Sequence, residues 1–133
     1  MFTPIQYDSG KLVKLPVTAA TFNKGDGMAT SGGYYQAAST SASSITHVAM
    51  ETLASAPTAG DKYLMLRVAG VVFEADCDAN SATTYAGTVV DLVNSSHLDI
   101  DSSTDDQFYV EEIVGATTDN KVQGWFTFSP TQT

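Results

Sequence analysis

The stretch KYLMLRVAGVVFEAD, residues 62–76, decides the fold class of this sequence. It is rich in β-branched and aromatic residues, and Leu64, Leu66 and Val68 share one face of an extended chain. Gly70 interrupts this alternation, which resumes directly after it. A glycine inside a strand pattern usually marks a bulge or a bend. The stretch therefore predicts one or two strands, with a bend that suits a barrel or a strongly twisted sheet.

Further strand-like segments lie on both sides of this stretch, and clusters of Gly, Ser, Asn and Asp separate them. They are residues 11–17, 33–39, 85–93, 97–100, 107–115 and 121–128. Short strands at regular spacing are typical of an all-β sandwich or barrel, and 133 residues fit one domain. We therefore predict an all-β fold, a small β-barrel or β-tulip-like sandwich over residues 11–133. An extended N-terminal arm is expected at residues 1–10.

The segment SSITHVAMETLAS, residues 43–55, is ambiguous. Ile45, Val48 and Leu53 fit a helical stripe behind a serine cap, but the segment also fits a strand. In that strand Ile45, His47, Ala49 and Glu51 face one way, and Thr46, Val48 and Met50 face the other. We favour the strand, in which His47 and Val48 face opposite ways.

Glycines precede two adjacent tyrosines in TFNKGDGMATSGGYYQAAST, residues 21–40. The stretch lacks the glycine spacing that cradles phosphates. Gly25–Gly27 instead predicts a tight turn, and Gly32–Gly33 predicts a second turn before a strand that begins at Tyr34. These glycines are therefore interpreted as architecture and not as a binding loop.

The charge balance is acidic, with 15 acids, six bases and a net charge of −9. Such a chain repels phosphate backbones and anionic membranes, so we expect neither direct nucleic-acid binding nor a membrane partner. Cys77 is the only cysteine, so no disulfide forms within one chain. The N-terminus lacks the pattern of a signal peptide, and no later run approaches the ~18 apolar residues of a membrane span. We expect synthesis in a cytoplasm.

No combination of residues indicates catalysis. A G-x-S-x-G elbow is absent, and lone histidines in strands, here His47 and His97, are more often hydrogen-bonded surface residues than catalysts. A zinc site would need carboxylates at uninformative spacings. Glu111 and Glu112 point to opposite faces of a regular strand, so they do not form a glycosidase pair. We therefore predict a protein that is not an enzyme and that needs no cofactor.

Two acidic stretches are candidates for calcium loops. The first begins at Asp76 like an EF-hand, but Ser81 replaces the required glycine and Gly87 replaces the bidentate glutamate. The second, DIDSSTDD at residues 99–106, clusters four carboxylates. A solvated turn is the favoured interpretation of this second stretch, and a cation site stays open.

Several aromatic and apolar residues have no evident place in a single core. Phe126 and Trp125 fall on opposite faces of their predicted strand, so if Phe126 points inside, Trp125 is exposed, at an interface or under a loop. Adjacent strand residues such as Tyr34 and Tyr35 likewise cannot share one core. Deleting residues 1–7 is expected to weaken assembly and to leave the domain folded. The candidates for a capsid or subunit interface are Phe2, Ile5, Tyr7, Tyr34, Tyr35 and Trp125.

The order PVTAATFNKGDGMATSGGYYQAAS and then THVAMETLASAPTAGDKYLMLRVAGVVFEAD resembles the small head-decoration, or capsid cement, proteins of tailed bacteriophages. The shared features are a Gly-Asp turn, a strand started by glycine, a strand that ends in alanine-rich sequence, and a second Gly-Asp turn at Gly60-Asp61. Residues 85–128 are similar to the C-terminal part of phage head proteins of this size. The resemblance covers Leu15 to Phe128 and consists of turns and alternation.

This resemblance implies a structural virion protein that binds the outer surface of a capsid as a homotrimer and reinforces the shell. The implied partners are the major capsid protein and further copies of this chain. The implied location is the outer capsid surface of the virion. An alternative is a tail- or fibre-associated module that binds carbohydrate through exposed aromatic residues.

Overall fold

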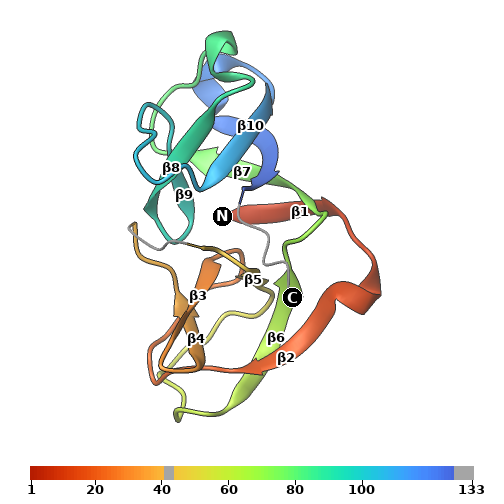
Figure 1. Cartoon of the computed structure of the whole chain (residues 1–133), viewed down its shortest axis with the longest axis vertical. Coiled ribbons are helices and arrows are strands. Elements are labelled where there is room, and N and C mark those ends of the chain that lie inside the picture. The colour runs from red at the N-terminus through yellow and green to blue at the C-terminus, as the bar shows by residue number, and fades with distance from the viewer. Residues whose placement is uncertain (41–43, 128–133) are drawn as a thin grey trace.

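The structure, a computed structural model, describes residues 1–40 and 44–127 (Figure 1). Within these residues the chain is all-β, as predicted, and its three helices are single 3-10 turns, none of them long or apolar enough to cross a membrane. The strands are β1 (Phe2–Gln6), β2 (Leu12–Pro16), β3 (Gly27–Ser31), β4 (Tyr34–Ala37), β5 (His47–Ala49), β6 (Lys62–Arg67), β7 (Val72–Cys77), β8 (Val89–Asn94), β9 (His97–Asp99), β10 (Phe108–Ile113) and β11 (Lys121–Phe126). The 3-10 turns are η1 (Ser9–Lys11), η2 (Thr83–Tyr85) and η3 (Thr117–Asp119).

One sheet closes into a barrel, which confirms that part of the prediction. Its order is β1-β7-β11-β10-β8-β9, and β9 also pairs in parallel with the end of β7. The five strands from β7 round to β9 therefore form a ring, which we call the closed barrel. β1 pairs with the first part of the same edge of β7. In Figure 1 this barrel is the upper lobe, and β1 lies between the two lobes.

The second sheet, which we call the curled sheet, has the order β2-β6-β5-β3-β4 and forms the lower lobe of Figure 1. Its two edge strands approach each other at a bridge between Val17 and Tyr35. The backbone N–H of Thr18 donates to the carbonyl of Tyr35 at 3.0 Å. The sheet thus curls around its own small core, in which Met28 and Met65 are buried.

The stretch 62–76 links the two sheets, since β6 belongs to the curled sheet and β7 to the closed barrel. Gly70 lies between them with φ of 74°, a conformation that side chains disfavour. The predicted bend is therefore confirmed. Alternation along β6 sends Met65 into the curled sheet and Leu66 into the larger core shared with the barrel. One strand thus contributes to both cores.

The core of the closed barrel contains four phenylalanines from four strands. Phe126 lies 4.8 Å from Phe2, 5.4 Å from Phe73 and 5.2 Å from Phe108 between ring centroids. Phe2 is 1% exposed. Residues 1–10 were expected to form an arm outside the core, but residues 2–6 are a sheet strand and Phe2 is a core residue, because its side chain points into the barrel.

The ambiguous segment contains a strand, β5, in which Val48 packs in the larger core and Ala49 in the curled sheet. The two predicted glycine turns are also present. Gly32 and Gly33 have φ of 59° and 87° and connect β3 directly to β4. Positive φ at both central residues defines the tight hairpin turn that matches strand twist. Two residues of the predicted segments lie outside the described residues. They are Ser43, the first residue of segment 43–55, and Phe128, the last residue of segment 121–128.

Candidate functional site

A row of apolar side chains crosses the outer wall of the closed barrel. Along β11, Val122 and Phe126 point inward and are buried, so Trp125 points outward. Tyr109 of β10 is its direct cross-strand partner. On the other side, the pairing of Gly124 with Phe73 places Trp125 beside Val72 of β7. The row therefore follows from strand alternation combined with register.

Trp125 and Tyr109 form a stacked pair on this wall. Their ring centroids are 4.7 Å apart and the rings are 28° from parallel. Trp125 nevertheless remains 37% exposed. Such offset stacking stabilises a cross-strand pair by about 0.5–1.5 kcal/mol beyond burial alone. Tyr109 thus covers one face of the indole.

Two hollows meet at Gly70–Val72, which line both of them. One contains Trp125 and Thr127. The other, of about 700 Å³, contains Ile5 and Tyr7. We call the combined depression the trough: Ile5 and Tyr7 form one end, Gly70–Val72 the middle and Trp125 the other end. The trough therefore runs across β1, β7 and β11.

Polar groups border the trough, and most of them already have partners. Gln123 donates to Glu111 at 2.9 Å from its side-chain amide. Lys11 donates from its ammonium to the carbonyl of Ala69 at 2.6 Å. The trough thus combines apolar side chains with hydrogen-bonded polar groups, a mixture found at protein interfaces.

The structure brings together three of the six predicted interface residues. Ile5, Tyr7 and Trp125 line the trough. The prediction that Phe2 is an interface residue is wrong, because its side chain is buried within the chain and is not available to a partner. Tyr34 is exposed on the curled sheet, whereas Tyr35 is half-buried and packs edge-on against His47 at 4.9 Å.

Tyr109 and Val72 belong to the apolar row beside Trp125 but are not among the interface residues predicted from sequence. Tyr109 alternates with buried Phe108 and Val110, so its outward direction could be inferred from sequence. Its place opposite Trp125 could not be inferred, because cross-strand register is not visible in a single strand.

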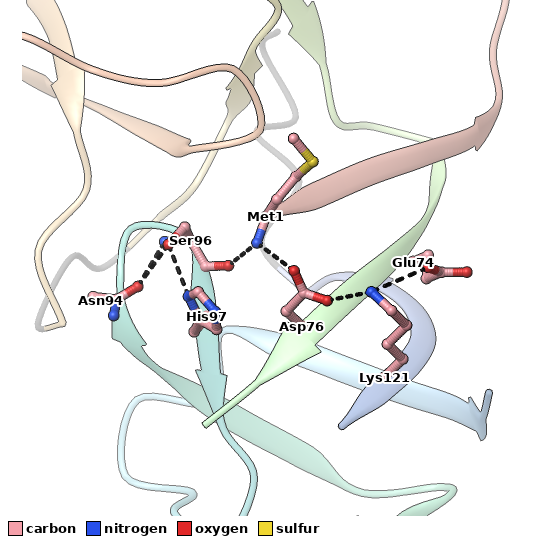
Figure 2. Close-up of polar contacts among 7 residues, drawn as sticks. All are labelled: Met1, Glu74, Asp76, Asn94, Ser96, His97 and Lys121. Carbon is pink, nitrogen blue, oxygen red and sulfur yellow. Dashed lines mark hydrogen bonds and ion pairs between the residues drawn. The ribbon is translucent and has the colours of Figure 1, made fainter. Parts of the chain in front are cut away.

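A chain of charged groups fastens the start of β1 to the barrel (Figure 2). The amino group of Met1 donates to Asp76 at 3.0 Å and also to the carbonyl of Ser96. Lys121 donates to the other oxygen of Asp76 at 2.6 Å and lies 3.7 Å from Glu74. Partial burial acts to raise the pKa of Asp76, but the hydrogen bonds from Lys121 and Met1 outweigh it and lower this pKa overall.

These groups connect β1, β7, β11 and the β8–β9 turn, so their role is architectural. In the same turn Asn94 accepts hydrogen bonds from the backbone N–H and the hydroxyl of Ser96, and that hydroxyl lies 2.8 Å from Nδ1 of His97. His97 is thus a hydrogen-bonded strand residue, as predicted.

The other two candidates for acid–base or nucleophilic chemistry are not poised for it. Burial, with a smaller contribution from the charge of Arg67, lowers the pKa of His47 to about 4. Burial, with contributions from Asp78 and Asp76, raises the pKa of the Cys77 thiol to about 12. At neutral pH His47 is therefore uncharged and Cys77 is a protonated, buried thiol.

The acidic stretch 99–106 is organised by a carboxylate outside it. Asp91 of β8 is buried and accepts from the hydroxyl of Ser102 at 2.8 Å. It also accepts from the backbone N–H groups of residues 104–106, at 2.7, 2.7 and 2.8 Å. Burial acts to raise the pKa of Asp91, but these four hydrogen bonds dominate and lower it. The stretch is therefore an ordered turn built around a buried anion.

Replacing Asp91 by asparagine is expected to destabilise the protein by about 2–4 kcal/mol at neutral pH, because an amide cannot accept all four hydrogen bonds. The folded-state pKa of Asp91 is lowered, so its contribution is complete above about pH 4 and is lost as pH falls through that lowered pKa. Urea unfolding of the wild type and Asp91→Asn should therefore converge at low pH. Asp105→Asn, with an exposed side chain in the same turn, is the control, and an equal loss there would contradict the role of Asp91.

A side-chain hydrogen bond with Asp101, together with burial and the nearby charges of Asp78 and Asp101, raises the pKa of Asp99. In residues 1–40 and 44–127, no group of three or more His, Cys, Asp or Glu side chains is arranged to hold a metal ion. Glu111 and Glu112 are both exposed, contrary to the expectation for a regular strand. The reason is a bulge in β10, where Val110 pairs with Gly124 but Glu112 pairs with the next residue along, Gln123.

The fold and its surface define a class: a small all-β protein with a closed barrel, a second curled sheet and an apolar trough on the barrel wall. Searches of protein-family models, of curated proteins and of solved structures each found no match to this chain.

Proposed function

We propose that this protein is a structural virion protein that binds the outer surface of a tailed-phage capsid as a homotrimer and stabilises the shell. The major capsid protein and further copies of the chain are its partners. The resemblance of its turns and strands to capsid cement proteins supports this proposal. The observation that carries it is the trough, an exposed apolar depression on a rigid barrel wall.

Single exposed apolar residues are ordinary in soluble proteins, but aligned ones are not. Ile5 is 53% exposed, and it lies with Tyr7 and Trp125 along one depression. Tryptophan and tyrosine are enriched among the residues that contribute most to binding between proteins. Ile5 and Trp125 lie on paired strands, which keeps them ordered before binding and lowers the entropy cost of association.

Assembly on a shell does not require a strong contact at any single site. A trimer docks several equivalent sites at once, so modest single contacts combine into tight attachment. No chemistry on a substrate is required of such a protein, in keeping with the protonated Cys77 and uncharged His47.

Co-sedimentation with expanded empty capsids of the cognate phage tests the proposal. Binding is expected to saturate at a fixed ratio of this protein to capsid protein, and coated capsids should withstand higher temperature than bare ones. A glycan array run in parallel should give no signal. Absence of capsid binding at saturating protein would overturn the proposal.

A second candidate is a tail- or fibre-associated module that binds carbohydrate. One observation favours it: the exposed face of Trp125 lies on the same wall as the polar pair Gln123 and Glu111. Sugars bind proteins through an apolar ring face together with hydrogen-bonding side chains, which this arrangement supplies. A glycan-array signal that Trp125→Ala removes, without capsid binding, would favour this candidate over the first.

A further inference from the structure

Charge is divided unequally between the two lobes. Residues 68–133, which supply the closed barrel, contain eleven acids and one base, Lys121. Residues 1–67, which supply β1 and the curled sheet, contain four acids and five bases. Residues 68–133 therefore carry a net charge of −10 and residues 1–67 a net charge of +1, so the barrel is acidic and the curled sheet is close to neutral.

The curled sheet also has a long segment without charge. No Asp, Glu, Lys or Arg occurs between Asp26 and Glu51, a segment that includes β3, β4 and β5. The tip of the β3–β4 hairpin projects freely, since a Cβ built on Gly32 or Gly33 would meet no atom within 4 Å. Tyr34, directly after this tip, is 40% exposed.

Exposed apolar side chains are thus found in two different places. Among the residues that the structure describes, the large exposed ones are Met1, Ile5, Tyr7, Tyr34 and Trp125. Three of them line the trough on the acidic barrel, and Tyr34 lies on the neutral hairpin.

Two troughs cannot easily face each other. Such a contact would bring two closed barrels against each other, each with eleven acids and one base in residues 68–133, and like charges at an interface are costly. The nearby cations offset only part of this charge. Lys11 keeps its charge, because the Ala69 carbonyl that it contacts is neutral, and Lys121 pairs with Asp76 and Glu74.

We infer that the β3–β4 hairpin of one copy, with Tyr34 at its tip, docks in the trough of a neighbouring copy. This inference rests on the homotrimer of the proposed function and names the two surfaces that join its copies. The hairpin brings an aromatic side chain and no acidic or basic residue of its own to a depression on the acidic barrel. Gly60 lies close to the Tyr34 hydroxyl, and the two residues that follow it, Asp61 and Lys62, have charges of opposite sign.

Because hairpin and trough are different surfaces, this contact joins copies head to tail. Head-to-tail contacts build a closed ring when the rotation between neighbours closes, as in a trimer. Each copy then contributes one hairpin and receives one, so no hairpin or trough is left exposed.

Two variants and their mixture test the contact. Tyr34→Ser removes the hairpin anchor, and Ile5→Glu places a charge in the trough. Both positions are exposed, so the fold should be kept, as circular dichroism will show. Each variant alone should weaken self-association roughly tenfold or more in sedimentation experiments. Lys14→Ala, on an exposed position of β2, is the control and should assemble like the wild type.

The equimolar mixture gives the sharper result, since the intact trough of Tyr34→Ser can receive the intact hairpin of Ile5→Glu. The mixture should form dimers that neither variant forms alone. Trp125 is the only tryptophan and lines the trough, so its quenching by acrylamide should fall when the dimer forms. A monomeric wild type, unaffected variants or a mixture without dimers would each overturn the inference. Capsid co-sedimentation of the same wild-type sample shows separately whether shell binding holds.

Discussion

Replacing Gly124 by alanine is expected to destabilise the protein by more than about 3 kcal/mol. A Cβ on Gly124 would lie 1.8 Å from the carbonyl oxygen of Tyr109 and 2.9 Å from the ring of Phe108. The first contact is with backbone, so no rotation of a side chain can relieve it. Gly124 pairs with Val110, where the bulge of β10 begins, and the two strands approach closely there.

Chemical unfolding followed by circular dichroism measures this effect, and Gly10→Ala is the matched control. The nearest atom to a Cβ on Gly10 is 3.4 Å away, at the flexible end of Asp8, so that change should cost less than about 1 kcal/mol. Similar stabilities for the two variants would show that β10 and β11 do not approach each other as described.

Replacing Phe2 by alanine is expected to cost about 3–5 kcal/mol of unfolding free energy. Phe2 is buried, with its ring centroid 4.8 Å from that of Phe126 and 5.8 Å from that of Phe108. Its removal leaves a cavity between aromatic rings that are held by paired strands and cannot collapse into the space. Deleting residues 1–7 should be worse still and should prevent stable folding, whereas the sequence alone predicted a removable arm.

Ile5→Ala is the matched control, since Ile5 belongs to the same strand but is 53% exposed. Its cost should be less than about 1 kcal/mol. Thermal or urea unfolding of both variants is the measurement. If Phe2→Ala were as stable as Ile5→Ala, the first strand would have to lie outside the core after all.

Much of the strand pattern could be predicted because alternation is a local property. The inward direction of Phe126 and the outward direction of Trp125 follow from the two-residue repeat of a β-strand. The two opposite faces of β6 follow from the same repeat. The glycine turn at Gly32–Gly33 was equally predictable, because positive φ is a property of the glycine itself.

The candidate site was predictable only in part. Ile5, Tyr7 and Trp125 were recognised as apolar residues without a core position, but their common trough depends on β1 and β11 both pairing with β7. The sequence of residues 99–106 does not indicate Asp91, which lies in strand β8 and accepts hydrogen bonds from the backbone of this turn. Its four carboxylates drew attention to a cation, while its backbone N–H groups are what define its shape.

The sequence by itself determined that this protein is all-β, where its tight turns fall, and which side chains of each strand share a face. These features depend on the sterics of neighbouring residues, which are nearly the same in any fold. Only the tertiary structure decided that one sheet closes, that Phe2 fills the barrel, and that neutral and acidic surfaces separate into different lobes. Those outcomes depend on which distant strands pair, and many registers of short strands satisfy the same local pattern until the whole core is packed.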